Sequence, residues 1–191
     1  MNSLAQAKQR IAEVIAQSSV PEDPRHSQNT REWLLEFDSS ADDALQIAAL
    51  GHDIDRAVGE RKVQRSGFSD YDAFKAAHAR NSAQILTELL EECGIDDAPF
   101  LQEVHRLVCC HEVGGDSRSD LLVDADSLSY FDVNLPLYFA RNSWEETQRR
   151  CVWGYRRLSE RSLLLAANLP YSDSELRRLV EASLAEVLAH P

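Results

Sequence analysis

Residues 42–57, DDALQIAALGHDIDRA, run from an alanine- and leucine-rich stretch into a histidine–aspartate pair. Leu45, Ala48 and His52 recur at the three- and four-residue spacing of one helix face, so we expect a helix whose buried face ends in polar side chains. A buried imidazole or carboxylate needs partners, because burying a polar group without them costs free energy. The stretch therefore predicts a helical environment with something bound at His52 and Asp53.

The helical period recurs along the rest of the chain, and no run of valine, isoleucine and aromatic residues alternates convincingly with polar ones. The chain has 191 residues, only 7 glycines and 6 prolines, and no internal repeat. It predicts an all-α, compact single-domain bundle over residues 1–191. The expected helices lie at about residues 4–15, 23–37, 40–52, 71–93, 99–112, 119–135, 143–167 and 173–189.

Three of the expected helices begin with recognisable capping signals. Asp23 and Pro24 predict an N-cap followed by proline at the first helical position. Ser39 or Ser40 is the expected N-cap of the helix that ends at His52. Ser172 opens an S-x-x-E capping box, and the helix that follows is expected to pack on the rest of the bundle.

The charge of the chain excludes some classes of partner. It has 20 Lys and Arg against 32 Asp and Glu, a formal net charge of −12, so a nucleic-acid polymer is not expected to bind. No window approaches the roughly 18 consecutive apolar residues of a membrane span. Lys8, Arg10 and Glu13 interrupt the N-terminal apolar pattern, which is not typical of a signal peptide. The four cysteines form no C-x-x-C pair, which favours reduced thiols and a cytoplasmic location.

Polar residues on apolar helix faces are the candidate functional residues. Helical spacing places one on each of five expected helices. They are His26, His52, His78, His111 and Asp126. One such histidine is most often a hydrogen-bonded core residue, but five helices that each direct a residue inward indicate a shared ligand. A divalent cation satisfies imidazoles and carboxylates together. His105 and His190, with mixed or terminal surroundings, are not expected to take part.

The order of these residues resembles a known signature. His26, then His52 and Asp53 in AALGHDI, then Asp126 in DADSL, is similar to the H…HD…D pattern of the HD superfamily of metal-dependent phosphohydrolases. The resemblance covers roughly residues 20–160. It implies a compact helical bundle in which these four residues bind a divalent metal ion.

Asp124 competes with Asp126 for the last ligand position, and the A-D-x-L segment common in the family favours Asp126. His78 and His111 extend the resemblance to the dinuclear branch, which includes HD-GYP-type cyclic dinucleotide phosphodiesterases and, with iron, inositol and phosphonate oxygenases. By this resemblance Asp53 bridges two metals. In the alternative, mononuclear arrangement the two additional histidines contact the substrate.

Other segments depart from particular branches of the family. No GYP segment follows His111, so hydrolysis of cyclic di-GMP is not supported. The mononuclear 5′-nucleotidases carry an acidic residue three positions after the HD aspartate, where this chain has Arg56. A guanidinium one turn from His52 can bind a phosphate bidentately. Lys62 and Tyr130 are further candidate substrate contacts.

We therefore expect a metal-dependent hydrolase of a small anionic phosphate ester, such as a nucleotide, with one or two divalent ions (Mn, Fe, Co, Zn or Mg). Asp53 and Arg56 are the expected catalytic residues, because a metal activates water and a guanidinium neutralises charge on phosphorus. Two alternatives stay open: a diiron oxygenase of the inositol or phosphonate type, and a non-enzymatic, metal-stabilised ligand-binding regulator. The sequence also leaves open a phosphomonoesterase or a phosphodiesterase, and a monomer or a homodimer.

Overall fold

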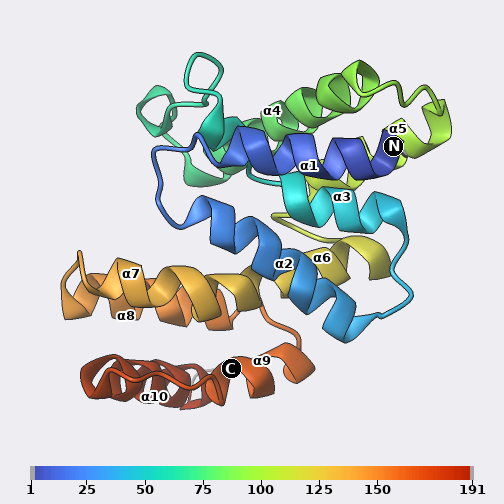
Figure 1. Cartoon of the computed structure of the whole chain (residues 1–191). Coiled ribbons are helices and arrows are strands. Elements are labelled where there is room, and N and C mark those ends of the chain that lie inside the picture. The colour runs from blue at the N-terminus through green and yellow to red at the C-terminus, as the bar shows by residue number, and fades with distance from the viewer. Residues whose placement is uncertain (1–2, 190–191) are drawn as a thin grey trace.

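The computed structural model describes residues 3–189, and over these residues it contains helices and no strands (Figure 1). The expected all-α fold is thereby confirmed. The α-helices are α1 Ser3–Ile15, α2 Asp23–Phe37, α3 Asp43–Gly51, α4 Tyr71–Glu92, α5 Ala98–Cys110, α6 Ser117–Ser129, α7 Leu135–Phe139, α8 Trp144–Tyr155, α9 Glu160–Ala167 and α10 Ser174–Ala189. Across residues 3–189, none of the helices has the length and apolar character that crossing a membrane requires.

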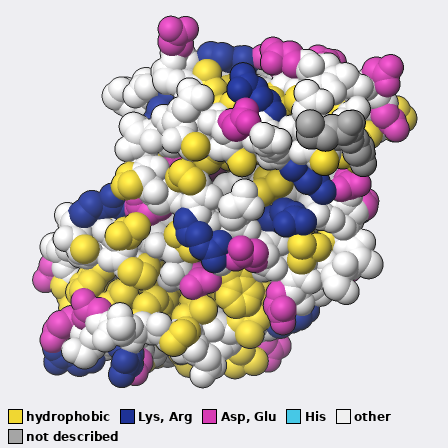
Figure 2. All heavy atoms as spheres, in the orientation of Figure 1, with side chains coloured by type: hydrophobic (Ala, Val, Ile, Leu, Met, Phe, Trp, Pro, Cys, Tyr) yellow, Lys and Arg dark blue, Asp and Glu magenta, His cyan; other side chains and the backbone are white. Residues whose placement is uncertain are grey.

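The helices form two groups around two apolar cores. Helices α1 to α6 surround the larger core, in which α2 packs against α3 and α6 and α4 packs against α5. Helices α7 to α10 form the lower part of the molecule in Figure 1, and in the same orientation in Figure 2, around the second core, with α10 packed against α8. Trp33 and Phe37 of α2 contact both cores. Helix α2 therefore joins the two groups into one bundle.

Helix α2 starts at Asp23 with Glu22, and not Asp23, in the N-cap position, where no side-chain cap hydrogen bond forms. Two other helix starts also differ from the predicted caps. Helix α3 is capped by Asp42, whose side chain accepts a hydrogen bond from the backbone N–H of Leu45, and not by Ser39 or Ser40. At the start of α10, Asp173 accepts from the N–H of Glu175 and of Leu176, so the predicted Ser172 capping box does not form. In both cases an aspartate closer to the helix provides the acceptor, and a carboxylate is also favoured by the positive end of the helix dipole.

The prediction of a single helix over residues 143–167 is wrong. The chain leaves helical geometry after Tyr155, and α9 starts after Ser159, whose hydroxyl accepts from the N–H of Ser162. Asp124 of α6 fixes this break, because its carboxylate accepts hydrogen bonds from the N–H and the hydroxyl of Ser159 at 2.9 and 2.5 Å. A contact across the tertiary structure thus ends a helix that local periodicity would continue.

The four cysteines are free thiols. Cys93, Cys109 and Cys110 are half-buried, and Cys151 lies fully buried in the second core. Burial raises the pKa of the Cys151 thiol to about 12. Cys151 is therefore a packing residue and not a nucleophile at neutral pH.

Candidate metal centre

The six predicted ligands lie together at the centre of the first helical group. His26 comes from α2, His78 from α4 and Asp126 from α6, whereas His52, Asp53 and His111 lie at the ends of α3 and α5. Two sets of ligand atoms each fall within 4.8 Å and share one residue: His26, His52 and Asp53 form one set, and Asp53, His78 and His111 form the other.

The carboxylate of Asp53 connects the two sets. Its Oδ1 lies 2.8 Å from Nε2 of His78. Its Oδ2 lies 3.5 Å from Nε2 of His52 and 3.7 Å from Nε2 of His26. Oδ1 of Asp126 closes the first set at 3.2 Å from His26 Nε2 and 3.4 Å from His52 Nε2. A carboxylate with its two oxygens turned to two different groups of imidazoles has the form of a bridging ligand.

All four histidines are held by their Nδ1 atoms. His52 and His111 each end a helix, and each Nδ1–H donates to the backbone carbonyl three residues earlier, that of Ala49 at 3.0 Å and of Val108 at 2.7 Å. These acceptors carry no proton, so they fix the tautomer whose Nε2 lone pair is free.

The other two rings follow the same rule. His26 Nδ1 lies 2.8 Å from the hydroxyl oxygen of Ser129, whose own proton is donated to the carbonyl of His26. His78 Nδ1 lies 2.7 Å from the buried carboxylate of Asp55. All four Nε2 atoms are thus directed at the centre, and in the neutral rings they present their lone pairs there, the arrangement by which proteins orient metal-binding imidazoles.

The electrostatics of the centre follow from opposite charges in a buried space. Burial by itself lowers the pKa of His52 and His78, but the neighbouring carboxylates outweigh it and raise both values to about 9. Burial lowers the pKa of His111, which has weaker acidic contacts. The carboxyl pKa values of Asp53 and Asp126 lie well below the ordinary value, because adjacent cationic groups outweigh the burial that would raise them.

Asp126 and Asp124, the two competing aspartates, have different surroundings. Asp126 faces His26 and His52, whereas Asp124 points to Ser159 at the start of α9. The histidine without an expected role, His105, lies on α5 near Thr87, away from the cluster. His190 lies outside the described residues.

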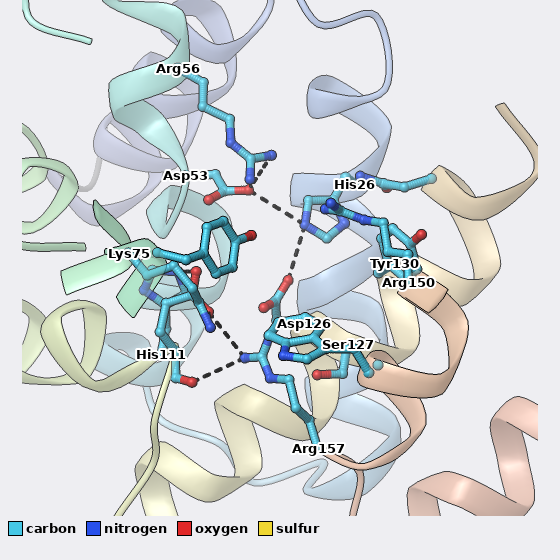
Figure 3. Close-up of a pocket in the computed structure, with 15 residues that line it drawn as sticks. His26, Asp53, Arg56, Lys75, His111, Asp126, Ser127, Tyr130, Arg150 and Arg157 are labelled. Atoms are coloured by element: carbon cyan, nitrogen blue, oxygen red, sulfur yellow. Dashed lines mark hydrogen bonds and ion pairs between the residues drawn. The ribbon is translucent and has the colours of Figure 1, made fainter. Parts of the chain in front are cut away.

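Arg56 lies where it can contact both the cluster and a ligand. It follows the cluster in a short 3₁₀ turn, Ile54–Ala57, which directs its guanidinium back to Asp53 at 2.7 Å and to the buried carboxylate of Asp23 at 3.3 Å. The same side chain lines a pocket that opens onto the cluster (Figure 3). Lys62, the other basic residue predicted to contact the substrate, is half-buried and does not line that pocket.

The pocket beside the cluster is polar and rich in cations. It encloses a cavity of about 90 Å³, and its lining includes the predicted substrate contacts Arg56 and Tyr130. The lining residues that the sequence did not predict as substrate contacts are Tyr71, Lys75, Glu112, Ser127, Asn134, Arg150, Trp153, Gly154 and Arg157. Figure 3 shows Lys75 and His111 across the cavity from Tyr130 and Arg150, with Arg157 below Asp126. Phe131, next to Tyr130, packs in the second core against Tyr155.

One group of pocket residues forms an ion-pair network. Glu112 forms ion pairs with Lys75 at 2.8 Å and with Arg157 at 3.2 Å. Both cations also lie over the ring of Trp153, each 4.6 Å from its centroid. Trp153 forms part of the pocket wall and is 41% exposed. The network connects α4 with the segment that follows α5 and with the end of α8, and no local pattern of the sequence indicates it.

Asp55 was not predicted to be a functional residue, although it lies within the HDIDR segment. Its side chain is 1% exposed and supports His78. Helical periodicity does not locate it, because the chain leaves the α-helical path after Gly51 and the 3₁₀ turn decides where Asp55 points. A carboxylate two residues after Asp53 was the available signal.

The molecule is thus an all-α bundle that holds a buried histidine–aspartate cluster beside a cationic pocket. The chain belongs to the family described as "Domain of unknown function (DUF4202)", whose model matches residues 3–180. The comparison with curated proteins and the comparison with solved structures each found no match.

Proposed function

We propose that the protein is a metal-dependent phosphohydrolase of the HD type that acts on a small phosphate ester. The observation that carries the proposal is the convergence of four Nε2 atoms and two carboxylates, with each Nδ1 held by a separate acceptor. Core histidines that serve only packing have no reason to share one tautomer and one target. The order of the six ligands in the sequence adds the resemblance to the HD superfamily.

The donor set fits divalent metals. Four imidazole nitrogens and two carboxylates suit Mn, Fe, Co and Zn. His26, His52 and Asp126 with one oxygen of Asp53 would hold one ion, and His78 and His111 with the other oxygen would hold a second. A divalent ion supplies Lewis acidity there: it lowers the pKa of water and neutralises charge on a phosphate group.

The side chains around the centre suit a phosphate ester. Arg56 lies next to the bridging carboxylate and can donate to phosphoryl oxygens from the side of Asp53. Lys75 and Arg157 share the single carboxylate of Glu112, so their combined charge is not fully balanced within the network. These cations favour an anionic substrate and stabilise negative charge that develops during displacement at phosphorus.

The test is metal analysis and a phosphoester panel on the full chain purified without chelators, with His111→Ala and its matched control His105→Ala. Both histidines belong to the α5 segment, but His111 faces the cluster and His105 does not. We expect bound metal and turnover in the parent and in His105→Ala, with both reduced at least tenfold in His111→Ala. If His111→Ala keeps the metal and the activity, the proposed site is wrong.

Two other outcomes separate the alternatives. Substrate-dependent oxygen uptake by an iron-loaded sample, without phosphoester hydrolysis, would replace the hydrolase by a diiron oxygenase. Metal content and phosphoester binding without turnover across the panel would indicate a ligand-binding regulator. Each outcome contradicts the phosphohydrolase proposal by a different measurement.

A further inference from the structure

One pocket cation has no anionic partner. Among the cations that line the pocket, Arg56 is paired with Asp53 and Asp23, and Lys75 and Arg157 are paired with Glu112. The guanidinium of Arg150 makes no ion pair with a carboxylate of residues 3–189. It lies instead between two aromatic rings, 5.2 Å from the centroid of Tyr130 and 5.0 Å from that of Tyr138.

Unpartnered polar atoms share the pocket with this guanidinium. Nε of Arg150 is buried without a hydrogen-bond partner, and so is the hydroxyl of Tyr130. The Oγ of Ser127, a residue only 5% exposed, and the Oδ1 of Asn134 are in the same state. All four residues line the one pocket beside the cluster. Buried polar groups normally have partners, so four unpartnered groups that line one cavity indicate a binding site for a polar ligand.

The backbone at this end of the pocket is adapted to present these groups. Tyr130–Asn134 forms a turn of π-helix between α6 and α7, closed by the N–H of Leu135 donating to the carbonyl of Tyr130. Pro136 follows and lacks an N–H, which removes a hydrogen bond that would tighten the turn into an α-helix. The wide turn carries Tyr130 and Asn134 at its two ends, and turns of this kind occur frequently at functional sites.

The charges decide what kind of ligand fits. Arg150 donates hydrogen bonds and carries a positive charge, and the hydroxyls of Tyr130 and Ser127 donate as well. Arg56 lies near enough to Arg150 to oppose its charge, although Tyr130 and other neighbours hold the Arg150 pKa above its ordinary value against the effect of burial. An oxyanion can accept hydrogen bonds from all of these donors, and its negative charge offsets the repulsion between the guanidinium groups of Arg56 and Arg150.

We propose that Arg150, Tyr130 and Ser127 form an oxyanion subsite that binds a second anionic group of the substrate. The inference rests on the proposed function and narrows its substrate class to small molecules that carry a further phosphate or carboxylate besides the reacting phosphate ester. Ser127 directly follows the ligand Asp126, so the subsite adjoins the metal cluster. Asn134 completes it by accepting from a hydroxyl of the ligand.

The test is a titration of the zinc-loaded full chain, or of the metal-free chain if zinc does not bind, with inorganic phosphate and separately with acetate. The Nε–H resonance of Arg150 in ¹⁵N-labelled protein reports on the subsite itself. We expect it to shift with saturation in phosphate, in acetate or in both, and the stronger ligand identifies the second group as a phosphate or a carboxylate. An unchanged Arg150 resonance with both probes overturns the proposal.

Matched variants separate binding from packing. Tyr130→Phe removes one hydroxyl and is expected to weaken binding of the stronger anion about 10- to 100-fold, the loss expected when one hydrogen bond to a charged group is removed. Tyr155→Phe is its control, because the Tyr155 hydroxyl is also buried without a partner but lies outside the pocket lining. Arg150→Gln removes the reporting resonance itself, so anion binding to this variant is measured by calorimetry and should be weakened at least tenfold. Arg149→Gln, on the exposed side of α8, should keep both the Arg150 resonance shift and the calorimetric affinity.

Equal effects of Tyr130→Phe and Tyr155→Phe would show that both hydroxyls act only in packing, against the proposal. The titration needs no turnover, so its result is independent of the proposed hydrolysis. A chain that hydrolyses phosphoesters without an Arg150 response has the activity but not the subsite. A response without hydrolysis retains the subsite and removes the enzymatic proposal.

Discussion

Replacing Asp126 by asparagine tests the metal centre most directly. The substitution keeps the size of the side chain but removes the charge that lies 3.2 Å from His26 Nε2 and 3.4 Å from His52 Nε2. Removing a residue that merely supports a metal ligand costs about 10- to 100-fold in metal affinity. Removing a carboxylate that itself faces the site should therefore cost about 100-fold or more, measured by metal titration and by elemental analysis after dialysis.

Asp124→Asn is the matched control, because it lies two residues away on the same helix. Its carboxylate accepts hydrogen bonds from Ser159, and an amide oxygen can still accept one of them. We expect unchanged metal content and a loss of about 1 kcal/mol in the free energy of unfolding, of the size of a weakened helix cap. Retention of metal in Asp126→Asn, or its loss in Asp124→Asn, would refute the assignment of Asp126 as a ligand.

Three further outcomes follow from the structure. Because His52 and His78 have pKa values of about 9 without metal, metal binding at pH 7.5 should release about two protons, and this number should fall toward zero above pH 9. Calorimetry in buffers of different ionisation enthalpy measures the number of protons released. A release near zero at pH 7.5 would contradict the assigned ligands. Gly51→Ala should lower the free energy of unfolding by about 1–3 kcal/mol, because its Cβ would lie 2.7 Å from buried Leu86 methyl carbons; an unchanged Tm would show that Leu86 can move aside. Cys151 should resist alkylation of the native protein at pH 8 and react after unfolding, and mass spectrometry of the modified peptide would reveal the contrary.

The raised histidine pKa values also set the pH dependence of the metal-free fold. His52 and His78 bind protons more tightly in the folded chain than in an unfolded one. Their charged contacts with the carboxylates therefore contribute stability that is fully present below pH 6.5 and is lost as the pH rises through about 9. A metal binds the neutral imidazoles, so its affinity rises as the pH rises over the same range. The stability that the metal adds therefore increases while the stability from the charged contacts decreases.

The amino-acid sequence determined the helical class of the protein and the candidate ligand set, because both depend on local order. Apolar residues at helical spacing define which side of a helix is buried, and a histidine on that side can be recognised from the sequence alone. The helix through Leu45 and Ala48 and its polar end at His52 were predicted in this way. The choice of Asp126 over Asp124 relied on resemblance, since both lie on the same helix in similar local sequence.

Only the tertiary structure decided how the ligands are oriented and what surrounds them. Ser129 and Asp55 support His26 and His78 from other segments, and such contacts depend on how helices pack. The break before α9 arises from a side chain on α6, which local periodicity does not register. Arg150 reaches the pocket because α8 packs beside the wide turn after α6, so its position follows from distance in space and not from spacing along the chain.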